Sequence, residues 1–542
     1  MSSDKSTRTP TGFMHSITIK KSDGPLRAIS CFALALLVVV MTGCVGRSSD
    51  TPNARDCYAI DRLPAIEPDY TATTLPPNIA PTNFGIQEPG RAYHVHIAAA
   101  SGQEISIDSR SPVIKIPMRA WRNLLTLNQG QSLRITVFVR DDQNKWGRFT
   151  SIENSIAEQD ITSHLVYRII PPLYQYYDKM HLYQRDLRSY AERAIAFNKS
   201  MGYNCINCHS FHDYNPDRML FHMRAGAVGT SMILLYDGAV RKVDTKTSFN
   251  RATSYRSWHP GGEVVAFAFN DVKQIFHAVG ENRDVFDTVS DLLVYNVTTN
   301  TISTSPKIST DERMETYPEW SPDGRYLYFC SAPGLDFYDK SQHPYKQMKY
   351  DLMRISYDPA SDSWGEIEPV LKASEMGMSV AHAKFSPDGN SILLCLSEYS
   401  YFPLYRPESD LYLLDVRTSS LTKADPLNSS AAESYHAWSE DGRWIVFSSK
   451  RRDGLCTDLY FSYFNGNGQF SKPFILPQKD PELHRKLFRV YNIPEFIRGP
   501  VKVRPQHIIR AAWSKRIQKA QLDAQVRKKT SQIEVPMYQP YP

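Results

Sequence analysis

The sequence of 542 residues predicts a mainly β protein made of several domains. It contains 31 Tyr and 24 Phe, which are residue types enriched in strands. It also contains 35 Pro and 26 Gly, which favour turns over long helices. One short pattern recurs four times in the second half of the chain, which indicates an array of similar β units. Because 42% of the residues are hydrophobic, the composition excludes a wholly disordered chain.

The first 43 residues have the pattern of an export signal. Basic residues precede an uncharged apolar run over residues 28–41, which is shorter than the ~20 residues of a membrane-spanning helix. The run ends at Thr42-Gly43-Cys44 and resembles a bacterial lipoprotein signal, which implies that Cys44 carries the lipid. We therefore predict a signal peptide over residues 1–43 and an exported protein, anchored by acyl chains to the outer membrane and facing the periplasm.

The next part of the chain predicts a linker, a sheet domain and a helical segment. Residues 44–85 carry no strong pattern and are predicted to be the linker. Polar and apolar residues alternate from residue 90 to 170, which predicts a small antiparallel β-sandwich over residues 86–172. Residues 173–228 are predicted to be a short helical segment, and this segment contains the strongest chemical motif in the chain.

That motif is Cys205-Ile206-Asn207-Cys208-His209, the CxxCH pattern of c-type haem attachment. Two thiols three residues apart on a helical turn can add to the two haem vinyl groups, while the adjacent imidazole lies under the iron. The motif predicts haem c, with thioethers to Cys205 and Cys208 and with His209 as iron ligand. Met219, His222 and Met223 are the candidate sixth ligands. A Cys205–Cys208 disulfide, a reduced thiol pair and a metal site remain alternatives.

The recurring pattern is an aromatic residue, a tight reversal containing Pro, Asp or Gly, and an apolar strand. The four units begin at Trp258, Trp320, Phe385 and Trp438. Each unit later has a second strand opened by Asp-Leu, at Asp291, Asp351, Asp410 and Asp458. Two matched signals in the same order predict a β-propeller. A less regular unit at residues 231–243 brings the number of blades that can be recognised in the sequence to five. The pattern resembles the TolB-like propeller over residues 229–478, with five to six blades expected.

Aromatic residues are concentrated in two insertions of the predicted propeller, residues 336–350 and 398–405. Such loops can form a docking surface, because Tyr offers apolar area and a polar tip. The residues predicted to bind a partner are Tyr338, Tyr345, Tyr399, Tyr401, Phe402 and Tyr405. The alternative is that these loops only cover blade edges.

The chain ends in a predicted extension over residues 479–542. From Arg498 onward the sequence contains ten Lys and Arg residues but only two acidic residues, although the net charge of the whole chain is only +6. Residues 506–529 are predicted to form a basic helix. Export makes nucleic acid the poorer partner for this charge, and no specific oligomer is indicated.

These features give two main functional hypotheses. In the first, a lipoprotein with covalent haem c transfers electrons or senses redox state while its propeller docks a partner. In the second, the propeller is a scaffold without haem for protein or glycan binding in the cell envelope, with Cys205–Cys208 as a disulfide. The sequence favours a non-enzymatic role and indicates no catalytic residue, because it lacks the G-x-S-x-G nucleophile motif. Hydrolysis by carboxylates far apart in the sequence stays open.

Overall fold

The structure is a computed structural model that describes residues 52–53, 55–172, 179–275, 284–335 and 344–526. These residues belong to one compact unit. The predicted signal peptide and Cys44 lie outside the described residues. In the part of the chain so described, no helix is long and apolar enough to cross a bilayer.

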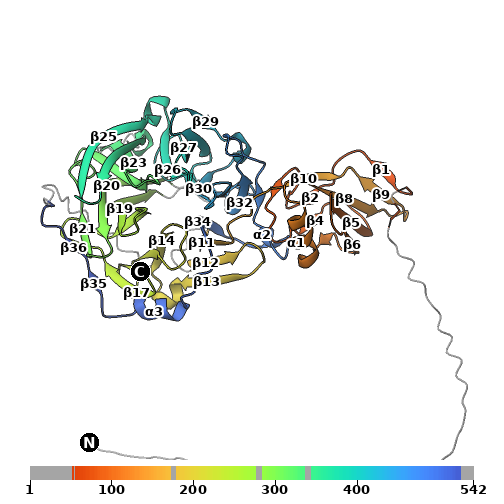
Figure 1. Ribbon diagram of the computed structural model, residues 1–542, viewed down its shortest axis with the longest axis horizontal. Helices are drawn as coiled ribbons and strands as arrows, with labels where there is room; N and C mark the ends of the chain where they lie inside the picture. Colours follow the sequence, from red (N-terminus) through yellow and green to blue (C-terminus); the bar gives the residue numbers. More distant parts are fainter. Residues whose placement is uncertain (1–51, 54, 173–178, 276–283, 336–343, 527–542) are drawn as a thin grey trace, which may run out of the picture. The chain divides into compact units, whose positions relative to one another are not determined.

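The N-terminal domain is built from two sheets and one helix (Figure 1). The larger sheet comprises β1 (Tyr58–Ile60), β3 (Thr74–Leu75), β5 (Ala92–Ala99), β6 (Ile105–Ser109), β8 (Ser132–Arg140), β9 (Trp146–Phe149) and β10 (Ile152–Ile156). The smaller sheet comprises β2 (Ile66–Glu67), β4 (Phe84–Ile86) and β7 (Val113–Ile114). Helix α1 (Met118–Leu127) buries Trp121, Leu124 and Leu125, which share one helical face.

The boundaries of this domain differ from the prediction. Residues 58–86 hold β1 to β4, so the predicted linker over residues 44–85 is wrong for most of its described length. These strands are two or three residues long and carry no alternation that a sequence pattern could reveal. At the other end, residues 164–170 belong to the propeller and not to the sandwich predicted over residues 86–172.

Within the described residues, the propeller consists of six sheets around a common centre (Figure 1). We number the blades 1 to 6 by their innermost strands, which are β34 (Val490–Ile497), β14 (Cys205–Phe211), β18 (Thr253–Trp258), β22 (Arg313–Trp320), β26 (Ser379–Phe385) and β30 (Glu433–Trp438). Each innermost strand contacts the innermost strand of the next blade, and β14 contacts β34. The ring is therefore closed, and the predicted propeller is confirmed with six blades.

Three further strands extend each blade outward, mostly through antiparallel pairing. In blades 1 to 3 they are β11 (His164–Ile170), β12 (His181–Asp186) and β13 (Glu192–Phe197), then β15 (Met219–Arg224), β16 (Ser231–Tyr236) and β17 (Ala239–Asp244), then β19 (Val264–Ile275), β20 (Asp284–Asn296) and β21 (Thr301–Ser303). In blades 4 to 6 they are β23 (Tyr326–Pro333), β24 (Asp351–Asp358) and β25 (Ser363–Leu371), then β27 (Ser391–Ser397), β28 (Asp410–Asp415) and β29 (Leu421–Lys423), then β31 (Trp444–Ser449), β32 (Asp458–Tyr463) and β33 (Phe474–Ile475).

Blade 1 joins the two ends of the propeller. Its innermost strand, β34, comes after blade 6 in the sequence, whereas β11, β12 and β13 come before blade 2. The pairing of β34 with β11 spans more than 300 residues of chain, for example at His164 with Ile497. The propeller therefore extends from residue 164 to 497, beyond the range of 229–478 predicted from the repeats.

The predicted helical segment over residues 173–228 is wrong. Its described part contains β12, β13, β14 and β15 with one short 3-10 turn, η1 (Asn198–Met201). Residues 181–197 are rich in Arg and Ala, which have good helix propensity, but strand pairing with β11 and within the blade determines their conformation. The CxxCH motif therefore lies on a strand and not on a helical turn.

The chain after β34 returns along the outside of the propeller. Helix α3 (Pro505–Ala512) is followed by β35 (Gln518–Lys519) and β36 (Gln521–Leu522), which pair in parallel with the outer strands of blades 2 and 3. The predicted basic helix over residues 506–529 is confirmed only over its first turns, because these pairings end it. The remaining short helices are α2 (Leu483–Lys486), η2 (Pro344–Gln347), η3 (Ala373–Met376), η4 (Pro403–Tyr405) and η5 (Asp425–Leu427).

Candidate functional site

The six innermost strands share one irregularity that shapes the centre of the propeller. In every blade, the pairing between the innermost strand and its neighbour shifts register in the second half of the strand. A bulge of this kind re-aims a side chain. The re-aimed residues form what we call the inner ring: Cys208, Tyr255, Tyr317, His382, Tyr435 and Ile493. Five of them have positive φ angles between 40° and 53°, a conformation that costs free energy in non-glycine residues and concentrates at functional sites.

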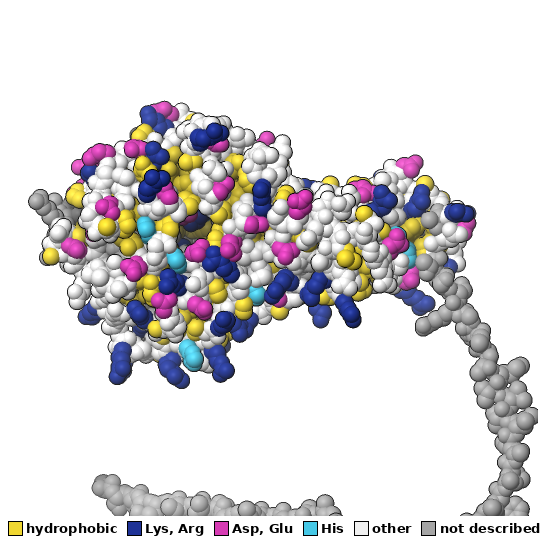
Figure 2. Space-filling model, in the orientation of Figure 1, with side chains coloured by type: hydrophobic (Ala, Val, Ile, Leu, Met, Phe, Trp, Pro, Cys, Tyr) yellow, Lys and Arg dark blue, Asp and Glu magenta, His cyan; other side chains and the backbone are white. Residues whose placement is uncertain are grey.

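Two further rings follow the inner ring along the same strands. The middle ring lies two residues later and contains Ser210, Ser257, Glu319, Lys384, Ala437 and Glu495. The outer ring lies one residue further and is aromatic in every blade: Phe211, Trp258, Trp320, Phe385, Trp438 and Phe496. The three rings line a cavity of about 260 Å³, which we call the channel. Figure 2 shows a hollow at the centre of the blades, with apolar side chains around it and a basic side chain inside it.

The inner ring closes one end of the channel. The ring centroids of Tyr255 and Tyr317 are 4.2 Å apart, those of Tyr317 and His382 are 4.3 Å apart, and those of His382 and Tyr435 are 4.3 Å apart. Tyr401, which is fully buried, packs against Tyr255 and Tyr317. This end of the channel is therefore covered by aromatic side chains, and the channel opens past the outer ring.

The aromatic insertion at residues 398–405 supplies this cover. The Tyr401 hydroxyl donates to Asp287 Oδ1 at 2.8 Å, and the Tyr399 hydroxyl donates to Asp284 Oδ1 at 2.8 Å. Both carboxylates belong to β20, so the insertion of blade 5 reaches across blade 4 to blade 3. Burial raises the pKa of Asp287 to about 7, against the hydrogen bonds from Tyr401 and Asn270.

The predicted partner-binding residues are therefore mostly misplaced. Tyr345, Tyr399 and Tyr401 are buried, and Phe402 and Tyr405 are half-buried. As a docking surface the buried three are wrong, because their rings are used for packing inside the protein. Tyr345, for instance, stacks on Phe286 with centroids 4.8 Å apart. Tyr338 lies outside the described residues.

The middle ring carries most of the charge in the channel. Lys384 Nζ and Glu319 Oε2 form an ion pair at 2.5 Å. Glu495 Oε1 accepts a hydrogen bond from the backbone N–H of Phe211 at 2.8 Å. The Glu495 side chain is 24% exposed. Its enclosure by the channel raises its pKa to about 7, although the positive charge of Arg256 opposes the shift.

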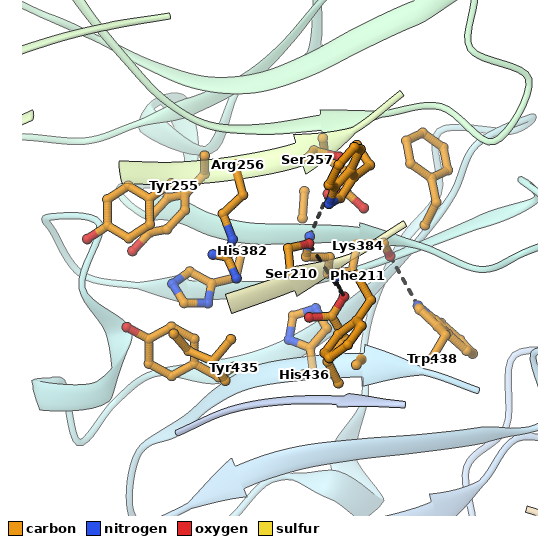
Figure 3. A pocket seen from close by; sticks show the side chains of 18 of the residues that line it. Ser210, Phe211, Tyr255, Arg256, Ser257, His382, Lys384, Tyr435, His436 and Trp438 are labelled. Atoms are coloured by element: carbon orange, nitrogen blue, oxygen red, sulfur yellow. Dashed lines mark hydrogen bonds and ion pairs between the residues drawn. The ribbon is translucent and has the colours of Figure 1, made fainter. Parts of the chain in front are cut away.

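Arg256, the residue after Tyr255, extends into the channel without a partner. Figure 3 shows its guanidinium group reaching from β18 toward the His382 ring. It forms no ion pair with any residue that the structure describes, and its buried Nε has no acceptor. An unpaired Arg in an enclosed site is unusual, because an unmet charged donor is costly to bury.

Two neighbours of Arg256 also have unmet polar atoms. His382 is only 6% exposed, and its Nε2 has no hydrogen-bond partner. The buried hydroxyl of Tyr317 interacts with Tyr255 but forms no hydrogen bond of full geometry with any described residue. Burial holds the pKa of His382 well below its usual value, with nearby cations including Arg256 adding to the effect, so its imidazole is neutral at pH 7. The three groups come from blades 3, 4 and 5 and can all donate hydrogen bonds, so together they suit an anionic group.

The CxxCH motif occupies blade 2 in register with this repeat. Cys208 is the inner-ring residue of β14, and its Sγ lies 2.9 Å from Asn207 Oδ1. Cys205 is a separate buried thiol outside the channel lining. His209 is buried beside Val166 of blade 1, with Nε2 3.8 Å from Glu495 Oε2. Both ring nitrogens of His209 lack a hydrogen-bond partner.

These residues do not fit a haem held by both thiols. Only Cys208 faces the channel, whereas Cys205 and His209 do not line it, so the three groups do not converge on one cavity. Both thiols are free in the structure. Haem c and electron transfer are predictions from the CxxCH motif that the arrangement of these side chains does not support.

The candidate sixth ligands lie on β15 and are buried. Met219 and Met223 pack in one hydrophobic cluster with Ile206 and Phe211. His222 lies on the other face, where its Nε2 is 2.6 Å from Thr253 Oγ1. None of the three lines the channel, and their burial in the blade accounts for their residue types.

Sequence reasoning missed Arg256, His382, Tyr317 and Glu495 as site residues. One signal could have found the last of these. The segment Pro318-Glu319-Trp320 of blade 4 corresponds to Pro494-Glu495-Phe496, which marks β34 as an innermost strand. Tyr317 also had a signal, because Tyr recurs three residues before the repeated Trp at Tyr255, Tyr317 and Tyr435. Arg256 and His382 follow no such recurrence.

Comparisons with known proteins bear on the fold alone. No family model matches the chain, and no curated protein matches it. Among solved structures, TolB from Acinetobacter baumannii is 13% identical, with a TM-score of 0.39 over 68% of this chain and 79% of that one. Oligogalacturonate lyase from Vibrio parahaemolyticus is 12% identical, with a TM-score of 0.30 over 62% of this chain and 88% of that one. A nidogen–laminin complex gives 8% identity and a TM-score of 0.35 over 62% of this chain and 98% of that one.

Proposed function

We propose that the protein is a binding scaffold whose channel receives a carboxylate group of a partner protein. The observation that carries this proposal is Arg256, a cation inside the channel with no acceptor for its buried Nε. The two carboxylates of the middle ring are already engaged, Glu319 by Lys384 and Glu495 by the Phe211 N–H. The described residues leave no acceptor for Arg256, so we infer that another molecule supplies it.

The walls of the channel support the same proposal. Arg and neutral donors suit the two oxygens of a carboxylate, and Tyr317 and His382 lie beside Arg256 with unmet polar atoms. The outer ring adds an aromatic rim, which is typical of protein-binding surfaces. The channel volume of about 260 Å³ is below the ~300–1,000 Å³ of sites for whole small molecules, so a side chain or chain end fits better.

The test is a titration with N-acetylphenylalanine, which carries an aromatic ring and a carboxylate. Trp258, Trp320 and Trp438 line the channel, so their fluorescence reports occupancy. We expect saturable binding that falls about 10- to 100-fold in Arg256→Met, because a hydrogen bond to a charged group contributes ~1.5–3 kcal/mol. The matched control is Arg417→Met, at an exposed position of blade 5, which should bind like the wild type.

N-acetylphenylalanine amide has the same shape without the charge. Equal binding of the acid and the amide, or equal binding by wild type and Arg256→Met, would contradict the proposal. Absence of any saturable fluorescence change with the acid would contradict it as well.

We also propose, from the sequence, that the protein is exported and attached to the envelope by lipid on Cys44. The support is the signal-like pattern of residues 1–43, which lie outside the described residues. The measurement is metabolic labelling with an alkyne fatty acid. Label should be incorporated into the wild type and lost in Cys44→Ser, and equal labelling of both would overturn this proposal.

A further inference from the structure

The region around helix α3 carries an unusual charge distribution. Six exposed or half-exposed basic residues lie between residues 502 and 519, and no acidic residue lies between residues 497 and 522. The six are Lys502, Arg504, Arg510, Lys515, Arg516 and Lys519. Figure 2 shows Lys and Arg side chains along the edge of the propeller where Figure 1 places α3. We call this surface the basic edge.

The basic edge has no charge partners among the residues that the structure describes. Arg498, just before it, pairs with Asp213 at 3.1 Å and with Glu440 at 2.8 Å. None of the six residues of the basic edge forms an ion pair with any other residue that the structure describes. Six unpaired cations on one short stretch repel each other. Contact with a negatively charged partner relieves this repulsion and lowers the free energy.

Two large aromatic side chains lie exposed on the same surface. Trp513 is 53% exposed, and its Nε1 donates to the Ser200 carbonyl at 2.8 Å. That bond places the indole beside the turn η1, and Tyr203, two residues past the end of η1, is 49% exposed. Exposed Lys199 on η1 adds a further cation. Trp and Tyr prefer the level of lipid headgroups, because their rings are apolar and their tips are polar.

We propose that the basic edge, with Trp513 and Tyr203, binds the surface of a bilayer that contains anionic lipid. The cations contact the lipid phosphates, and the two aromatic rings enter the headgroup layer. Nucleic acid bases can also stack on exposed rings between cations, but the export expected from residues 1–43 separates the protein from nucleic acid and favours a lipid surface. The proposal is independent of the channel and of ligand binding there.

The test is cosedimentation with vesicles of phosphatidylcholine containing 30% phosphatidylglycerol. The protein is the chain from residue 45 onward, so that neither the predicted signal peptide nor an acyl chain is present, and binding to pure phosphatidylcholine vesicles is subtracted. We expect binding that weakens strongly between 50 mM and 500 mM NaCl. The triple variant Arg510→Gln, Lys515→Gln, Arg516→Gln should lose about 100-fold in affinity, since each cation near the surface contributes about fivefold.

The matched control carries the same change in net charge elsewhere. Arg110→Gln, Lys145→Gln, Arg417→Gln alters three exposed basic residues outside the basic edge and should bind like the parent protein. Trp513→Ala should weaken binding severalfold while leaving the salt dependence in place. Both variants are checked for an unchanged thermal unfolding midpoint.

Three results would overturn the proposal. One is equal loss of binding in the control triple variant, which would mean that only net charge matters. Another is no net binding to anionic vesicles over neutral ones. The third is displacement from vesicles by a stoichiometric amount of single-stranded DNA, which would assign the basic edge to nucleic acid.

Discussion

Strands β14 and β30 hold the same place in blades 2 and 6, yet only one of them looks like a cofactor motif in the sequence. Cys208-His209-Ser210-Phe211 and Tyr435-His436-Ala437-Trp438 each supply an inner-ring residue, a buried His, a small residue and an outer-ring aromatic. In both, the His packs against the second strand of the preceding blade, at Val166 and at Leu393. The comparison indicates that the second half of CxxCH is a unit of the propeller repeat.

The largest expected effect tests whether both strands are parts of the core. Phe211 and Trp438 are equivalent and almost fully buried. Phe211→Ala and Trp438→Ala should each lower the free energy of unfolding by about 3–5 kcal/mol, because a large cavity is left behind. Urea denaturation followed by far-UV circular dichroism measures this. A cost below 1 kcal/mol for Phe211→Ala alone would show that β14 is not an integral blade strand.

The two histidines should differ, although they occupy equivalent places. His436 Nε2 lies 2.7 Å from the Leu393 carbonyl oxygen, whereas His209 contacts the Val166 backbone without reaching the geometry of a full hydrogen bond. His436→Leu should therefore destabilise the protein by about 1–3 kcal/mol, because a buried carbonyl loses its donor. His209→Leu should be close to neutral. The same urea titration distinguishes them, and equal losses would contradict the comparison.

Binding in the channel should depend on pH through Glu495. Its pKa is raised to about 7, so it gains a proton in the folded protein as the pH falls from 8 to 6. The charged Glu495 carboxylate repels the ligand carboxylate and attracts the same two cations, Arg256 and Lys384. Once Glu495 is protonated, N-acetylphenylalanine should therefore bind severalfold more tightly at pH 6. Glu319 is held by Lys384, and His209 stays neutral because its pKa is well below the usual value. Glu495→Gln should remove the dependence, and an unchanged slope in that variant would contradict this reading.

The same group affects stability with a defined sign. Because its folded pKa is raised above the usual value of 4.5, the folded state holds a proton that the unfolded state has released between about pH 4.5 and 7. Stability should therefore fall as the pH rises through this window, by roughly 1–3 kcal/mol. Thermal unfolding midpoints of wild type and Glu495→Gln should converge below pH 4.5 and separate near pH 7, in favour of the variant.

The smallest expected effect concerns the CxxCH motif, where we expect no change in the mass of the protein. Because Cys205 and His209 do not line the channel, we expect no covalent haem on mature protein made in a host with haem-attachment machinery. Intact-mass spectrometry measures this directly. A mass increase of one haem that disappears in Cys208→Ser would show that β14 is rebuilt around a cofactor.

The sequence was informative where residue patterns repeat. Trp258, Trp320, Phe385 and Trp438 located four of the six blades. Blade 1 was not predicted, because its innermost strand, β34, is separated from β11 by more than 300 residues. In addition, β34 is not followed by the kind of tight turn that marks the repeated units. The helical reading of residues 181–197 failed because strand pairing overrode local propensity.

The candidate site could be predicted only in fragments. Each of its four key residues, Tyr317, Arg256, His382 and Glu495, comes from a different blade. Their grouping depends on closure of the ring and on bulges that turn side chains inward, and neither leaves a local signal. The aromatic insertion at residues 398–405 was noticed, but its composition alone did not distinguish an exposed docking loop from the buried cover of a channel.

Arg256 lies inside a closed ring and has no carboxylate partner among the described residues. A crystal structure of the protein grown with N-acetylphenylalanine tests most directly whether a ligand supplies that carboxylate. We expect a carboxylate oxygen within hydrogen-bond distance of Arg256 Nε, with the phenyl ring against the outer ring. A channel in which Arg256 instead pairs with Glu495 or Glu319, with the ligand absent, would contradict it.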